Sequence, residues 1–145
     1  MKAPGTIWLH DSQPRCAPPP GQQLQTKTQP KTWPNPSGLS FTGFAGSPRY
    51  SPHGGNQWTE PEARDMLRAL PAADVLLTHS PPEGVNDDPD DRAHRGSGAL
   101  RAWVERRRPA WLLHGHTLPN PARRVGRLGP TRVVHVRGAL ALELS

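Results

Sequence analysis

One sequence feature most constrains how this chain can fold: two short apolar runs each end in a histidine, and a helical pattern lies between them. The runs cover residues 74–79 and 110–116, and the helical pattern covers residues 97–108. A strand, a crossover helix and a second strand make parallel neighbours in one sheet, so the sequence predicts an α/β fold. Parallel neighbours end at the same sheet edge, where ligands of open α/β sheets bind, so His79 and His116 should face one cavity. Neutral imidazole binds transition metals well, and two converging imidazoles predict half of a metal site.

A strand pattern and a helix pattern precede this unit. Residues 39–44 alternate with period two, as a half-buried strand does. Thr59 and Glu62 have the spacing of a capping box, and Pro61 falls in the first turn, so a helix should begin here. Its predicted apolar face consists of Ala63, Met66, Leu67 and Leu70.

Two alternating segments, residues 131–137 and 139–144, predict strands near the C-terminal end. The break between them at Arg137 and Gly138 is tight enough for a hairpin or a bulge. His135 belongs to the alternation, which favours a surface or sheet-packing role over metal ligation. The preceding stretch, residues 118–130, is turn-rich and basic.

Length and composition predict one domain with an unstructured part. The chain has 145 residues, of which 33% are hydrophobic and 19 are proline. Residues 1–12 hold a short strand-like run, and residues 13–38 are rich in Pro and Gln without any hydrophobic period, which predicts a disordered or flexible segment. Residues 39–145 would form the α/β domain. The single Cys16 excludes an internal disulfide. Without a membrane-spanning run or a signal-peptide core, the sequence predicts a cytoplasmic protein.

The charge pattern leaves a second functional hypothesis open. The net charge is +6, carried almost wholly by arginine, so a non-catalytic basic protein could bind nucleic acid or other phosphates. The arginines concerned are Arg106, Arg107, Arg108, Arg123, Arg124 and Arg127. The triplet at residues 106–108 also ends the predicted helix, where cations complement the helix dipole. Four carboxylates, Asp87, Asp88, Asp90 and Asp91, lack the spacing of a calcium loop and predict a solvated acidic loop.

Three blocks occur in the order found in a known family. Residues 43–48 precede the helix that carries Glu60 and Glu62, residues 74–82 read DVLLTHSPP, and residues 114–116 read HGH. Together they resemble the C-terminal half of a calcineurin-like metallophosphoesterase, over roughly residues 39–144. The combination of Thr-His-x-Pro-Pro with Gly-His one helix later is fairly specific.

The resemblance implies an αββα sandwich of two packed sheets flanked by helices. It also implies two metal ions, commonly manganese, iron or zinc, bridged by an aspartate and by a hydroxide that attacks a phosphate ester. It assigns His79 and His116 to one of these metals. The sequence Leu9-His10-Asp11 resembles the family's Asn-His-Asp block, in which His10 would match the catalytic histidine.

The chain departs from the family pattern at several ligand positions. The family's Asp-x-His and Gly-Asp blocks have no counterpart, Leu118 stands where the closing block has its second histidine, and Leu9 replaces the metal-binding asparagine. We therefore expect a truncated or degenerate member with an incomplete two-metal site. An upstream half or a partner chain would complete that site, and the isolated chain should hydrolyse phosphate esters slowly or not at all.

Overall fold

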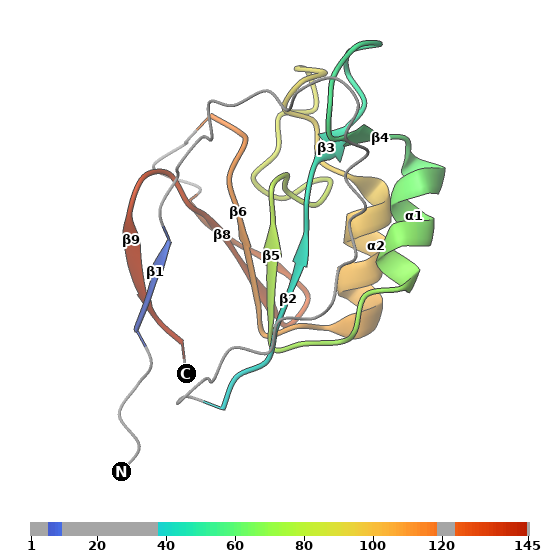
Figure 1. Cartoon of the computed structure of the whole chain (residues 1–145). Coiled ribbons are helices and arrows are strands. Elements are labelled where there is room, and N and C mark those ends of the chain that lie inside the picture. Colours follow the sequence, from blue (N-terminus) through green and yellow to red (C-terminus); the bar gives the residue numbers. More distant parts are fainter. Residues whose placement is uncertain (1–5, 10–37, 119–123, 145) are drawn as a thin grey trace, which may run out of the picture.

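The protein has a mostly parallel five-stranded sheet covered on both faces (Figure 1). The computed structural model describes residues 6–9, 38–118 and 124–144. The strands lie in the order β2 (Phe41–Phe44), β5 (Val75–Thr78), β6 (Trp111–His114), β8 (Thr131–His135) and β7 (Val125–Leu128). The first four are parallel, and β7 runs antiparallel to β8. The α/β class predicted from the strand–helix–strand unit is confirmed.

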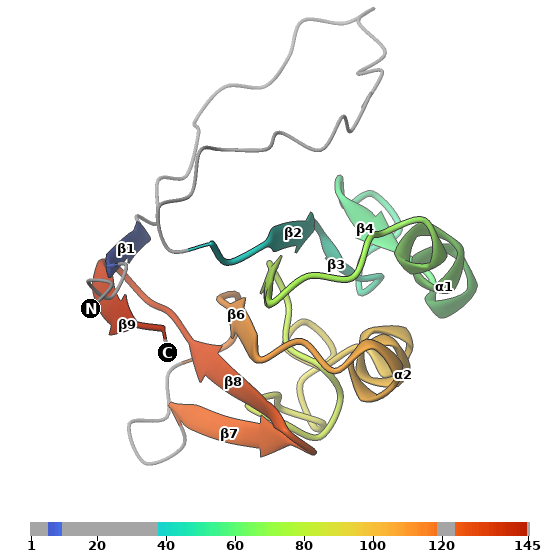
Figure 2. The same ribbon diagram turned by 90° about the horizontal axis from the view of Figure 1, so that it is seen from below.

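Two helices cover one face of this sheet, and a two-stranded antiparallel sheet lies over the other (Figure 2). The helices are α1 (Glu60–Arg68) and α2 (Gly98–Arg107), and the small sheet pairs β1 (Thr6–Leu9) with β9 (Leu140–Glu143). A third sheet at the carboxyl ends of the central strands pairs β3 (Ser47–Pro48) with β4 (Gln57–Trp58).

The core is divided into two apolar clusters by the central sheet. Successive residues of a strand point to opposite faces, so each central strand supplies both clusters. In β6, Leu112 packs into the cluster under the helices, and Leu113 packs into the cluster under β9. In β5, Leu76 and Val75 divide in the same way. Both strands are therefore apolar up to their last residue, Thr78 in β5 and His114 in β6, as expected for strands covered on both faces.

Helix α1 begins at the predicted capping box. The Thr59 hydroxyl accepts a hydrogen bond from the Glu62 amide, and the Glu62 carboxylate accepts one from the Thr59 amide at 2.7 Å. Ala63 and Leu67 are buried, as predicted from the apolar stripe. The prediction for Met66 was wrong, because its side chain is 43% exposed. A nine-residue helix buries only a narrow stripe, and Met66 lies beside it.

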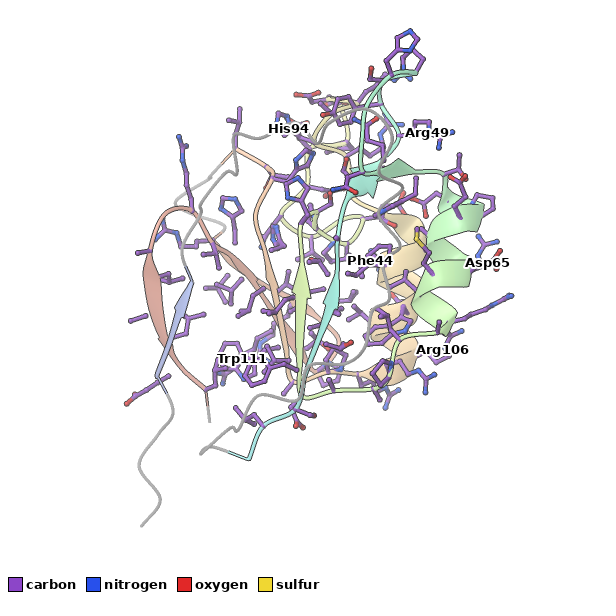
Figure 3. The ribbon with its side chains drawn as sticks, viewed as in Figure 1. Phe44, Arg49, Asp65, His94, Arg106 and Trp111 are labelled. Carbon is purple, nitrogen blue, oxygen red and sulfur yellow. The ribbon has the colours of Figure 1, made fainter. Side chains whose placement is uncertain are left out.

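Helix α2 is capped at its start by Ser97 and at its end by Arg108, which adopts the left-handed conformation with φ of 52°. Arg106 and Arg107 occupy its last turn, where they complement the negative end of the helix dipole. Because α2 returns from the carboxyl to the amino ends of the strands, these arginines lie at the end of the molecule remote from His79 and His116. Figure 3 shows Arg106 in this position.

The hairpin or bulge expected between the two C-terminal strands, at Arg137 and Gly138, was wrong. Strands β8 and β9 form no hairpin, because β8 pairs with β6 and β7 whereas β9 pairs with β1 in the other sheet. Gly138, with φ of 70°, lies where the chain crosses from one sheet to the other. Strand β7, within the stretch that looked only turn-rich, joins β8 through Gly129 and Pro130.

Some predictions concern residues outside the described part. His10, Cys16 and Arg123 lie there, as does the Pro- and Gln-rich segment apart from Gly38. Within the described residues, neither helix has the length and apolarity needed to cross a membrane.

Candidate functional site

His79 and His116 lie together at the carboxyl edge of the sheet. Strands β5 and β6 are parallel with Thr78 opposite His114, and the ladder continues through a 3.1 Å hydrogen bond from the Gly115 amide to the His79 carbonyl. The two imidazole centroids are 4.5 Å apart. The predicted juxtaposition is confirmed, whereas the role of these residues as metal ligands stays a prediction.

Both histidines line a cavity of about 250 Å³ beside the small β3–β4 sheet. Its opposite wall is the segment from Ala45 to Gln57, including Tyr50, whose ring centroid is 6.3 Å from that of His116. The Ser80 hydroxyl holds this wall to the sheet by donating to the Gly46 carbonyl at 3.3 Å. Gly46 has φ of 86°, and a Cβ there would collide with the Asn56 carbonyl, so the wall requires glycine.

The backbone at His116 is held in an uncommon conformation. Its φ is 67°, and the Thr117 amide donates to the Gly115 carbonyl at 2.8 Å across it. A hydrogen bond between residues i+2 and i around a positive-φ centre defines the rarer and more strained form of γ-turn. Such strain costs on the order of 1–3 kcal/mol and persists only where surrounding contacts hold it.

The contact that holds the His116 ring comes from the acidic loop. His116 Nε2 lies 2.5 Å from the Ala93 carbonyl oxygen. A carbonyl only accepts, so Nε2 carries the proton in this pair, and Nδ1 is the nitrogen with a lone pair. Metal-binding histidines usually have this arrangement, in which one ring nitrogen donates to the protein and the other faces the ion.

His94 is a further histidine at this site, which the sequence reasoning missed. Its ring centroid is 5.4 Å from that of His116, and its Nδ1 lies 2.6 Å from Asp91 Oδ2. Figure 3 shows His94 at the same end of the molecule as the carboxyl ends of the strands. The hydrogen bond from His94 lowers the pKa of the Asp91 carboxyl, and the Ala93 amide lowers it further. The sequence signal that could have found His94 was its position three residues after Asp91, a spacing that allows the two side chains to form a hydrogen bond.

The acidic loop is bonded to its own backbone rather than merely solvated. Asp87 accepts from the Gly96 amide at 3.1 Å, and Asp88 accepts from the Asp90 amide at 3.1 Å. Asp91 accepts from the Ala93 amide at 2.9 Å. These three carboxylates therefore hold the loop together through its backbone amides.

Two other histidines are buried in the sheet and contribute no surface to the cavity. His114 and His135 stand side by side on β6 and β8, with ring centroids 5.2 Å apart. Desolvation lowers the pKa of His114 to about 4 and also lowers the pKa of His135. His114 is therefore neutral, with Nδ1 paired to the Gly115 carbonyl and Nε2 to the Asn86 amide. His135 packs within the sheet, as its place in the alternation predicted.

The described residues fit one metal ion in part. His79 and His116 offer two imidazoles at one edge, and the tautomer of His116 suits ligation. Across residues 38–118 and 124–144, no group of three or more His, Cys, Asp or Glu side chains is arranged to hold a metal ion. Leu118, where the family pattern has a histidine, is 74% exposed.

Comparison with known proteins adds no family or function. No protein-family model matches the sequence, and no curated protein matches it. One crystal structure is similar with a TM-score of 0.46 and 20% identity, over 65% of this chain. The chain spans 38% of the length of that protein. A likeness at this level supports no argument about function.

Proposed function

We propose that this chain is a calcineurin-like metallophosphoesterase that carries part of a two-metal site for phosphate-ester hydrolysis. The observation that supports the proposal is the adjacency of His79 and His116 at the carboxyl ends of β5 and β6, beside a cavity. The sequence blocks that end in these residues are those that resemble the family. The αββα sandwich is part of the same proposal, and its supporting feature is a central sheet packed between two helices and a second sheet.

Four described residues of the site have a role in this proposal. His79 and His116 would hold one divalent ion, such as manganese, iron or zinc, as neutral imidazoles. When bound, the metal supplies Lewis-acid polarisation of the phosphate and lowers the pKa of bound water. The Ala93 carbonyl keeps the His116 proton on Nε2, and the wall that contains Tyr50 bounds the space for the ester.

The remaining ligands would come from polypeptide outside the described residues or from a partner chain. Two imidazoles do not balance the charge of a divalent ion, and a two-metal site needs carboxylates to offset the repulsion between its ions. His10, the candidate catalytic histidine, belongs to that undescribed part.

We predict weak metal binding and little or no hydrolysis by the isolated chain. Binding of Mn²⁺ and Zn²⁺ can be measured by titration calorimetry, and turnover with an aryl phosphodiester in added Mn²⁺. His79→Ala and His116→Ala should each weaken metal binding about tenfold or more, because each removes one of two ligands. The exposed His53 is the matched control, and His53→Ala should leave binding unchanged.

Equal metal affinity in all four proteins would contradict the proposed site. Fast, Mn²⁺-dependent turnover that both site substitutions abolish would support the function and contradict the incompleteness of the site.

A further inference from the structure

We propose that Asp91 is a positioning residue for this centre: its carboxylate shapes the acidic loop so that the Ala93 carbonyl fixes His116 as the Nε2–H tautomer, leaving Nδ1 to bind a divalent transition metal ion. This inference rests on the proposed function for its metal, but its geometric part does not. The acidic loop, to which the family resemblance assigns no role, would then hold a metal ligand in place.

The His116 ring depends on the acidic loop for its orientation. The ring follows a strained γ-turn, so its backbone does not settle in this conformation by local preference. Among the described residues, the side-chain hydrogen bond that orients the ring is the one from Nε2 to the Ala93 carbonyl. The orientation and the tautomer of His116 therefore depend on where that carbonyl stands.

The Ala93 carbonyl in turn depends on Asp91 for its position. Both oxygens of Asp91 are used: Oδ1 accepts from the Ala93 amide at 2.9 Å, and Oδ2 accepts from His94 Nδ1 at 2.6 Å. The Asp91 main chain also accepts from the His94 amide at 3.0 Å. Asp91 thus binds the residue that presents the carbonyl and the residue after it, and fixes the peptide between them.

Asp91 differs from its acidic neighbours in the hydrogen bonds that its carboxylate accepts. Asp87 and Asp88 accept from amides at other points of the loop, and the exposed carboxylate of Asp90 accepts no hydrogen bond in the described structure. If the loop acted only through its negative charge, substitution of any of the four aspartates would have a similar effect on His116. A positioning role instead singles out Asp91, and Asp90 becomes the matched control.

The test compares the full chain with Asp91→Asn, Asp91→Ala and Asp90→Asn. Asparagine keeps an oxygen for the Ala93 amide but replaces the acceptor that faces His94, and alanine removes both acceptors. The tautomer of His116 is read at pH 8 without metal, from long-range ¹H–¹⁵N correlations of ¹⁵N-histidine-labelled protein. Zinc affinity is measured by calorimetry, and amide spectra verify that each variant is folded.

In the wild-type chain and in Asp90→Asn, His116 should be the Nε2–H tautomer with the same zinc affinity. In Asp91→Asn and Asp91→Ala, the tautomers should mix and zinc affinity should fall about 10–100-fold, the usual cost of losing an outer-shell partner. An Nδ1–H tautomer in the wild-type chain would overturn the proposal. So would an Asp91→Ala variant with unchanged tautomer and affinity, or an equal effect of Asp90→Asn.

The two proposals fail in different ways. The tautomer measurement needs neither metal nor substrate, so a wild-type chain that binds no zinc would overturn the metal function, while the tautomer data would still decide what Asp91 does. Asp91→Asn is the milder change and carries the test if Asp91→Ala does not fold.

Discussion

At the scale of the residue, identical side chains acquire opposite properties from their surroundings. His114 and His116 are two positions apart, yet His114 is buried among apolar strands and His116 lines a cavity. Desolvation keeps His114 neutral, with a pKa of about 4. The turn at Gly115 and His116 ends the strand alternation, so the second ring leaves the core for the sheet edge. The motif His-Gly-His therefore contains one structural histidine and one candidate ligand.

His114 should make the fold less stable in mild acid. Its folded pKa of about 4 lies below the ordinary 6.5, so the unfolded chain binds the proton first as pH falls. The contribution of neutral His114 to the free energy of unfolding is fully present above pH 6.5. It should be about 2 kcal/mol smaller at pH 5 than at pH 7. His135 acts in the same direction. Urea unfolding at the two pH values measures the difference, and His114→Asn should reduce it by about that amount.

His53→Asn, at an exposed position, serves as the control for replacing a histidine by asparagine. A pH dependence that survives His114→Asn intact would contradict the assignment.

At the scale of the element, helix α2 depends on α1 for its N-terminus. The first turn of α2 has no acidic residue, although the positive end of a helix favours one. Glu60, the first residue of α1, supplies it: its Oε2 accepts from the Ala99 amide at 2.6 Å and from the Ser97 hydroxyl at 3.3 Å. The two helices are thus joined by a cap as well as by their apolar faces.

Glu60→Ala should lower the free energy of unfolding by about 1–2 kcal/mol, because it removes a charged acceptor from a helix N-terminus. Glu105→Ala is the matched control. It breaks an exposed ion pair with Arg101 within α2 and should cost about 0.5 kcal/mol or less. Urea unfolding at pH 7 compares the two variants, and equal losses would argue against the shared cap.

At the scale of the whole molecule, the central sheet needs covers on both faces. Helices α1 and α2 cover one cluster, and β9 covers the other with Leu140 and Leu142 packed against it. The alternate residues, Ala141 and Glu143, are exposed. A short strand near the C-terminal end therefore completes a core to which β5, β6 and β8 contribute Val75, Trp111, Leu113 and Val134.

Leu142→Ala should lower the free energy of unfolding by about 1–2 kcal/mol, less than for a fully buried leucine because its side chain is half-buried. Ala141→Ser, on the opposite face of the same strand, should change it by about 0.5 kcal/mol or less. Chemical denaturation of both variants checks the expectation. A loss of stability in Ala141→Ser but not in Leu142→Ala would show that the buried and exposed faces of β9 are assigned the wrong way round.

The sequence by itself determined the strand–helix–strand unit, the parallel pairing of β5 with β6, the capping box of α1 and the meeting of His79 with His116. Each follows from local periodicity, or from the rule that a helical crossover makes strands parallel, so nearby residues carry the information. Only the tertiary structure decided that β9 pairs with β1 rather than β8, that Glu60 caps α2, and that the loop of Asp91 and His94 reaches His116. These contacts join segments far apart in the chain, or depend on a strained turn, and no local pattern specifies which distant partner a strand edge, an amide or an imidazole will meet.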